Sequence, residues 1–270
     1  MRKATVLGLA LAVALLAVAL PGIGRVQAQG ALAGQHICLD PGHGGTDPGA
    51  TNEPFGLEEA DINLDVAFGL KALLEYDGAM VVMTRTDDRY LTNSDRYTFC
   101  NAEKATLLIS VHTNSVSDPT WDGSQTLYFK KEDLALAQAV HPVLYQYLLT
   151  GAPDQVAFRD LGLNQYASGV LLKSDMPAIM PEPLFMSCPD EAQELTVTIH
   201  AVDAEGVALL DATGDPMPNP ECMGCRRAQI AQAIHAGVLA YVESGGEGGD
   251  DGGDNGGQGG PPCANPPCRK

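Results

Sequence analysis

Positive charge is scarce in this chain. Its 270 residues include 16 Lys and Arg against 34 Asp and Glu, and the formal net charge is −18 at pH 7. Because nucleic acids repel a chain of this sign, the composition argues against a DNA or RNA partner. Hydrophobic residues make up 45% and charged residues 19%, which is ordinary globular composition and excludes disorder along the whole chain.

The sequence has one long apolar run and no internal repeat. Residues 4–20 carry no charge, follow Arg2 and Lys3, and precede small residues at 26–28. A basic start, an apolar run and a small-residue cleavage point are typical of export signals. We therefore expect residues 1–28 to be a cleaved signal peptide, with no membrane segment left afterwards; an uncleaved anchor is the alternative.

The far end of the sequence has few apolar residues. Residues 245–260 include ten glycines, and a Pro- and Cys-containing segment, 261–268, follows. Such a composition buries too little apolar surface to offset the entropy of ordering. Residues 244–270 are therefore predicted to be a disordered tail behind one folded domain at 31–243, with an insertion at 196–220.

Seven cysteines fit an oxidising compartment. They are Cys38, Cys100, Cys188, Cys222, Cys225, Cys263 and Cys268. Cys38 and Cys100 lie in apolar patterns and are expected to be small buried side chains. Cys222 and Cys225 favour a structural disulfide over free thiols or a metal site, and a bridge from Cys188 to this pair is a further alternative.

Short apolar runs alternate with helical patterns between the two ends. Strands are predicted at 36–39, 80–84, 107–111, 126–129, 170–172 and 177–180, and a hairpin at 196–210. Helices are predicted at 59–76, 93–104 (with Asn93 as N-cap), 132–149 and 221–242, and a long loop at 40–58. This order predicts an α/β fold: a single domain with a mixed, largely parallel central sheet flanked by helices on both faces.

Two histidines and one acid are predicted to meet at one edge of this sheet. His43 and His112 each follow a predicted strand, and ligands in open α/β sheets gather at the carboxyl ends of strands. Glu59 shares the apolar face of its helix, and an inward carboxylate needs a partner. Two imidazoles and a carboxylate are a common zinc set. No HExxH motif occurs, and histidines with purely local hydrogen bonds are the alternative.

Several short motifs occur in a recognisable order. They are Asp40-Pro41-Gly42-His43-Gly44-Gly45, Gly56-Leu57 before Glu59, Thr84-Arg85, Arg96 before Asn101, and Ile109-Ser110-Val111-His112 before Asn114. Over roughly residues 35–240, the chain resembles the zinc-dependent N-acetylmuramoyl-L-alanine amidases of the amidase type 3 family.

The resemblance implies a site and a reaction. His43, Glu59 and His112 correspond to the ligands of one zinc ion, and both the family spacing and the helix face favour Glu59 over the neighbouring Glu58. Glu182, after an apolar strand, corresponds to the acid that exchanges protons with water and the leaving amine. The implied substrate is the amide between N-acetylmuramic acid and L-alanine in peptidoglycan.

Two further residues and the location of the protein complete the expectations. Asn114 and Arg85 are candidate substrate-binding residues, although a structural role is the alternative for each. The export signal and the implied substrate together predict a secreted, periplasmic or cell-wall-associated protein. The oligomeric state is left open.

Two other functions remain open at this point. Pro181 and Pro183 flank Glu182, where the family has other residues. Because proline fixes φ and removes a backbone donor, a misdirected Glu182 would leave a non-catalytic wall-binding module of the same fold. A related metallopeptidase acting on another amide is the third hypothesis.

Overall fold

The computed structural model describes residues 30–153, 157–203, 209–210 and 216–246. The predicted signal peptide lies outside these ranges, and so does most of the predicted tail. Within the described chain, no helix has both the length and the apolar character needed to cross a membrane.

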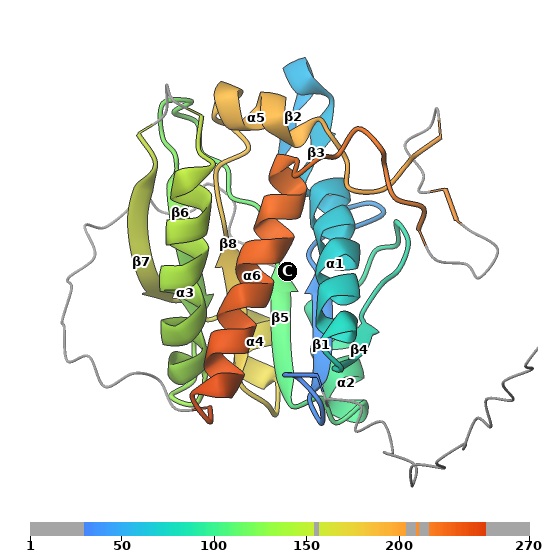
Figure 1. Cartoon of the computed structure of the whole chain (residues 1–270), viewed down its shortest axis with the longest axis vertical. Coiled ribbons are helices and arrows are strands. Elements are labelled where there is room, and N and C mark those ends of the chain that lie inside the picture. The colour runs from blue at the N-terminus through green and yellow to red at the C-terminus, as the bar shows by residue number, and fades with distance from the viewer. Residues whose placement is uncertain (1–29, 154–156, 204–208, 211–215, 247–270) are drawn as a thin grey trace, which may run out of the picture.

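The central sheet of the described chain has six strands in the order β4-β1-β5-β8-β6-β7 (Figure 1). These strands are β1 His36–Pro41, β4 Met80–Met83, β5 Leu107–Val111, β6 Gly123–Tyr128, β7 Arg159–Gln165 and β8 Ala178–Glu182. The strands β4, β1, β5 and β8 are parallel, whereas β6 runs antiparallel to β8 and is followed by a parallel β7. The predicted mixed, largely parallel sheet is confirmed.

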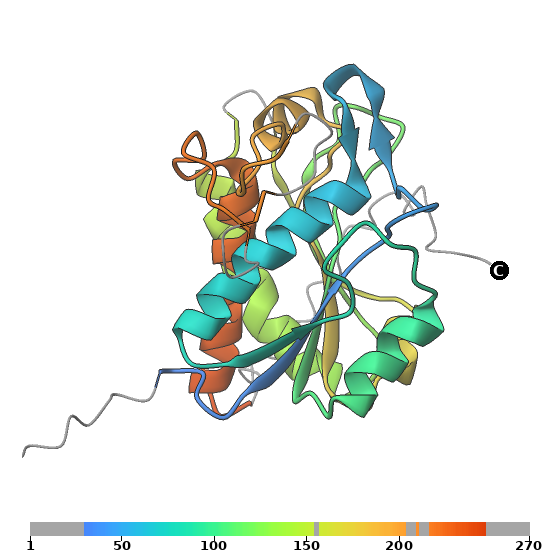
Figure 2. The ribbon, with the colours of Figure 1, turned by 90° about the vertical axis from the view of Figure 1, so that its right-hand side faces the viewer.

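Helices cover both faces of this sheet (Figures 1 and 2). They are α1 Glu59–Tyr76, α2 Asn93–Ala102, α3 Asp133–Thr150, α4 Gly169–Lys173, α5 Pro189–Leu195 and α6 Arg226–Glu243. Helix α6 lies between α1 and α3 on one face, and α2 packs beside α4 on the other. The single α/β domain with helices on both faces is therefore as predicted.

Side chains of the strands alternate between two hydrophobic clusters. Ile109 and Ile179 belong to the larger cluster, which lies under α1, α3 and α6. Leu108, Ala178 and Met180 belong to the smaller cluster, which lies under α2 and α4. Both faces of β5 and β8 are thus buried, as is usual for parallel strands covered by helices on both sides.

Several local predictions were wrong. The run 170–172, predicted as a strand, lies in α4, where the Ser168 hydroxyl caps the helix by accepting a hydrogen bond from Leu171 N (3.1 Å). Short apolar runs fit either structure, so periodicity alone could not decide. Thr92, not Asn93, caps α2 in a capping box with Asp95.

The segment predicted as a loop at 40–58 holds a short antiparallel hairpin. The segment predicted as an insertion, 196–220, also forms strand-like pairs. The hairpin consists of β2 Thr51–Asn52 and β3 Leu57–Glu58, joined by the 3-10 turn η1 Glu53–Phe55. In the insertion, His200 pairs with Pro218 and Leu210 with Pro216. The predicted hairpin at 196–210 therefore also pairs with the chain that follows it; residues 204–208 and 211–215 lie outside the described residues.

The cysteines differ in part from expectation. Cys38 and Cys100 are buried as expected, but they are bonded to each other, with Cα atoms 5.7 Å apart. The disulfide forms because Cys38 faces the side of β1 that α2 covers. The sequence does not show this contact, since the two cysteines lie far apart along the chain. Cys222 and Cys225 form the favoured disulfide, and Cys188 is a buried free thiol, so the bridge from Cys188 was wrong.

Candidate active site

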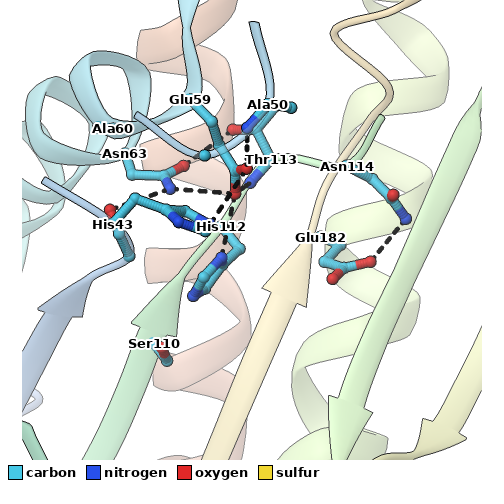
Figure 3. Close-up of polar contacts among 12 residues, drawn as sticks. His43, Ala50, Glu59, Ala60, Asn63, Ser110, His112, Thr113, Asn114 and Glu182 are labelled. Atoms are coloured by element: carbon cyan, nitrogen blue, oxygen red, sulfur yellow. Dashed lines mark hydrogen bonds and ion pairs between the residues drawn. The ribbon is translucent and has the colours of Figure 1, made fainter. Parts of the chain in front are cut away.

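Three metal-ligating side chains converge where β1, β5 and α1 meet (Figure 3). His43 lies just after β1, His112 just after β5, and Glu59 at the first position of α1. One potential ligand atom from each of the three lies within 4.8 Å of the other two. Side chains this near need only small shifts to bind one ion at ligand distances of about 2.1 Å.

Glu59 joins the two imidazoles in this structure. Its Oε2 lies 3.2 Å from His43 Nε2, and its Oε1 lies 3.0 Å from His112 Nδ1. Burial alone would raise the pKa of Glu59, but the two histidines hold it well below its usual range. Burial lowers the pKa of His43, yet Glu59 and Asp47 together raise it to about 9. Glu59 is therefore ionised, which is the form in which a carboxylate could bind a metal.

Further hydrogen bonds fix the Glu59 carboxylate. Ala50 N donates to Oε2 (3.0 Å), and Thr113 N donates to Oε1 (3.2 Å). Asn63, one helical turn along α1, donates from Nδ2 to Oε1 (3.3 Å). Sequence reasoning missed Asn63, although its position four residues after Glu59 puts both on one helix face.

Two glycines make room for the site. A Cβ at Gly42 would lie 2.3 Å from Cε1 of His112, so the imidazole occupies the space that any other residue would fill. A Cβ at Gly49 would lie 2.7 Å from both Glu59 Oε2 and His43 Cδ2. Glycine at these positions is therefore a steric requirement of the cluster.

The backbone of His43 is held in an unusual conformation. Its φ is 62°, in the left-handed region that non-glycine residues rarely adopt. Arg96 Nη2 donates to the His43 carbonyl (2.8 Å), and Asp47 Oδ2 lies 3.0 Å from His43 Nδ1. These contacts fix both the ring and the backbone that carries it.

Asp40 lies buried beneath this loop. It accepts hydrogen bonds from Thr84 Oγ1 (2.7 Å), Ser110 Oγ (2.7 Å) and Arg96 Nη1 (2.9 Å). Burial acts to raise the pKa of Asp40, but the Arg96 charge and these hydrogen bonds keep it below its ordinary value. The aspartate is therefore an ionised anchor for Arg96.

Arg85 supports the loop rather than facing a ligand space. Its side chain is 2% exposed, and Nε donates to the Pro41 carbonyl (3.0 Å). Nη2 donates to the carbonyls of Gly42 (2.9 Å) and Ala60 (2.8 Å). The structure thus favours the structural role over the predicted substrate contact.

Sheet register puts Glu182 beside the cluster. Ile109 of β5 is paired with Ile179 of β8, and just beyond the two strands Asn114 is paired with Phe185. On the other side of β8, Glu182 is paired with Gln125 of β6. Glu182 therefore lies at the end of β8, between the segment after β5 that carries His112 and Asn114 and the neighbouring strand β6 (Figure 3).

Two amides bind the Glu182 carboxylate. Asn114 Nδ2 donates to Oε2 (2.6 Å), and Gln125 Nε2 donates to the same oxygen. The flanking Pro181 and Pro183 leave Glu182 at the end of β8 with its pairing to β6 intact. Sequence reasoning missed Gln125, which lies just before the strand predicted at 126–129 and within the observed β6.

A cavity of about 230 Å³ opens beside the cluster. His43 and His112 form part of its wall, and Asn93 at the start of α2, Ser168 before α4 and Met180 of β8 line it further. Of the predicted site residues, Arg85 is the one that is buried beneath the loop and bonded to backbone carbonyls. The ones brought together are His43, Glu59, His112, Asn114 and Glu182.

The fold and this cluster define a class: α/β proteins with a candidate divalent-metal site at the carboxyl ends of parallel strands. Comparison with known families is more specific. Residues 37–203 match the family model described as N-acetylmuramoyl-L-alanine amidase. The chain belongs to this family.

Individual proteins and structures similar to this chain carry the same family description. LytC, an N-acetylmuramoyl-L-alanine amidase of Bacillus subtilis, is 30% identical over 191 residues, covering 69% of this chain and 36% of that protein. The germination-specific amidase of the same species is 37% identical and matches 60% of this chain and 71% of its own. The amidase structure from Clostridium difficile 630 superposes with a TM-score of 0.60 at 30% identity, covering 79% of this chain and 98% of that one. The chain spans between a third and just over half of the length of LytC and the probable cell wall amidases LytH.

Proposed function

We propose that this chain is a zinc-dependent N-acetylmuramoyl-L-alanine amidase. Its substrate would be the amide between the lactyl group of N-acetylmuramic acid and the L-alanine of a peptidoglycan stem. His43, Glu59 and His112 would hold one zinc ion, and Glu182 would be the general base and acid. The observation that carries the proposal is the meeting of three ligand-type side chains, near a Glu182 that is hydrogen-bonded to Asn114, in a chain of this family.

The donor set fits zinc. Two imidazoles and a carboxylate leave a fourth tetrahedral position open, as in catalytic zinc sites. When bound, zinc supplies a Lewis acid that polarises a carbonyl and makes water more acidic. Asn63 and two backbone N–H groups orient Glu59 by hydrogen bonds, as the partners of a metal ligand usually do.

Glu182 carries the proton transfers in this mechanism. Its carboxylate takes a proton from water, whose oxygen forms a bond to the lactyl carbonyl carbon. As the C–N bond breaks, Glu182 returns that proton to the departing nitrogen. The products are a lactyl carboxylic acid and a free α-amino group on L-alanine, so one water is consumed for each bond cut.

Export to the cell wall is part of the proposal. Residues 1–28 have the composition of a signal peptide, and the substrate lies outside the cytoplasm. We place the folded domain at 31–243, with the insertion at 196–220 and the acidic tail at 244–270 as accessory segments.

The test is digestion of purified sacculi by the full chain, with and without a chelator. We expect released peptides that begin with a free L-alanine, by mass spectrometry, and loss of release when the chelator removes zinc. Glu182→Gln should lose activity by about 10²-fold or more. Glu59→Gln should bind less than one zinc per chain, whereas Glu58→Gln, on the exposed neighbour, should bind zinc and cut as the wild type does.

Other results would contradict the proposal. Binding to sacculi without hydrolysis by the zinc-loaded chain would favour the non-catalytic wall-binding module. Fragments cut at a different amide would favour a related metallopeptidase.

A further inference from the structure

Gln125 is a buried amide whose position the amidase motifs quoted above do not account for. It lies on β6 opposite Glu182 and is 8% exposed. Its Nε2 donates to Glu182 Oε2, the oxygen that also accepts from Asn114 Nδ2 (2.6 Å). One oxygen of the proposed general base is therefore held from both sides by amide N–H groups.

The orientation of the Gln125 amide is set from behind. Asn164 of β7 donates from Nδ2 to Gln125 Oε1 (3.0 Å) and to the Leu161 carbonyl (3.1 Å). Because a backbone carbonyl only accepts, Asn164 must direct its NH₂ group to that side. Gln125 then presents its oxygen to Asn164 and its NH₂ group to Glu182.

The Asn114 amide is oriented in the same way. Ser115 N donates to Asn114 Oδ1 (2.7 Å), which directs the Asn114 NH₂ group toward Glu182. Each amide is thus fixed at its far end by backbone, through Asn164 on one side and directly on the other. Both donors are suited to an ionised carboxylate at position 182, because N–H groups favour the charged form over the protonated acid.

We propose that Gln125, oriented by Asn164, is a positioning residue for Glu182 that keeps its carboxylate ionised and fixed for proton transfer. This role rests on the proposed amidase function. On the side of β5, His112 is a titratable residue two positions before Asn114, whereas β6 and β7 contribute the uncharged amides of Gln125 and Asn164.

Replacing the amide by a carboxylate of the same shape isolates this role. In Gln125→Glu, two carboxyl groups at hydrogen-bond distance would share one proton, which would raise the apparent pKa of the pair and leave less of Glu182 ionised at neutral pH. In Asn164→Asp, the new acceptor would draw the Gln125 NH₂ group toward β7 and leave the Gln125 oxygen facing Glu182. The two variants disturb the same contact from different strands.

The experiment compares these variants of the full, zinc-loaded chain on a soluble muropeptide. The control is Gln165→Glu, the same chemical change on an exposed side chain of β7. We expect Gln125→Glu to lower kcat about 10- to 100-fold at neutral pH, with KM changed less than about threefold. The acidic limb of its pH–rate profile should move up by about one unit, so that activity recovers partly at alkaline pH. Asn164→Asp should change both quantities in the same direction, and Gln165→Glu should change neither.

Zinc content and the melting temperature are measured alongside, because a purely structural role would lower stability without moving the pH profile. If Gln125→Glu does not fold, Asn164→Asp, on the edge strand, carries the test alone. An active wild type with unchanged kcat and pH profile in the folded variants would overturn the positioning role and leave the amidase proposal standing. A wild-type chain that cuts no peptidoglycan would overturn both.

Discussion

Asp40 and Arg96 form a buried ion pair, 2.9 Å between Oδ1 and Nη1, directly beneath the loop that carries His43. The same guanidinium donates to the carbonyls of Pro41 (2.7 Å) and His43 (2.8 Å). Fold stability and the geometry of the candidate metal site therefore depend on one side chain.

Arg96→Met should lower both the stability of the fold and the affinity of the candidate site for zinc. Removing one partner of a buried pair leaves the other charge uncompensated, so we expect a loss of about 3–5 kcal/mol in the free energy of unfolding. Zinc affinity should fall as well, because the His43 carbonyl loses its donor. Urea denaturation and zinc titration measure the two effects.

The exposed Arg89, paired with Asp87, provides the control, and Arg89→Met should match the wild type in both measurements. The double variant Asp40→Asn/Arg96→Met should recover part of the stability. A double variant no more stable than Arg96→Met would show that the uncompensated charge is not the cause.

Gly42→Ala should displace His112. The added Cβ would lie 2.3 Å from the ring, and no rotation of a methyl group removes that overlap. We expect zinc affinity to fall about 10-fold or more, comparable to losing a partner of a metal ligand. Isothermal titration with zinc measures it.

Gly56→Ala is the control for replacing a nearby glycine where the added Cβ meets no other atom. Gly56 has φ +64° with open space around the Cβ position. Its replacement should cost about 1 kcal/mol of stability and leave zinc affinity unchanged. Equal zinc affinities in the two variants would contradict the steric argument.

The Cys38–Cys100 disulfide should contribute more stability than Cys222–Cys225. The first joins residues 62 apart and the second residues 3 apart. In the chain-entropy account, the longer loop is worth about 4 kcal/mol and the shorter about 2 kcal/mol. The pairwise Cys→Ala variants, compared by chemical denaturation, should keep this order, and the reverse order would refute it.

Asp122 should make stability fall as pH rises from about 4 to 7. Burial, reinforced by the nearby Glu191, raises the pKa of Asp122 from 3.8 to about 7, against opposing contributions from the Phe185 and Gly123 amides and Arg226. Within that pH range the folded chain keeps a proton that the unfolded chain has released, so the free energy of unfolding decreases with pH.

Asp122→Asn removes this titration and keeps an oxygen for the hydrogen bond from Phe185 N (3.0 Å). The variant should lose less stability than the wild type between pH 4 and 8, measured by denaturation at each pH. Asp118→Asn, on a fully exposed acid, should follow the wild-type curve. Parallel curves for Asp122→Asn and the wild type would contradict the argument.

The predictable part of the site follows from local rules. Glu59 was expected to point inward because it shares the apolar face of α1, and it is 5% exposed beside both histidines. His43 and His112 were expected at the ends of strands that proved to be parallel neighbours. Helix periodicity and strand-end placement were sufficient to predict where these three side chains lie, because both can be read from a short segment of sequence.

Other features depend on contacts between distant segments. Strand β7, Arg159–Gln165, was not predicted, because its burial pattern does not alternate as a half-buried strand's does. The hydrogen bond from Gln125 to Glu182 requires the β6–β8 register, and the Cys38–Cys100 bond requires α2 to lie over β1. A pairing between strands or layers cannot be read from either segment alone.

The placement of Glu182 at the end of β8, opposite Gln125, limits how β8 can evolve. Successive residues of a strand face opposite sides, so a deletion of one residue between Pro177 and Glu182 would turn the carboxylate from the side of α2 and α4 to the side of α3 and α6. Variation in chain length is therefore tolerable in the loops around this strand but not within it. In homologous or engineered versions, an insertion or deletion inside β8 would separate Glu182 from Asn114 and Gln125 even where every motif residue is retained.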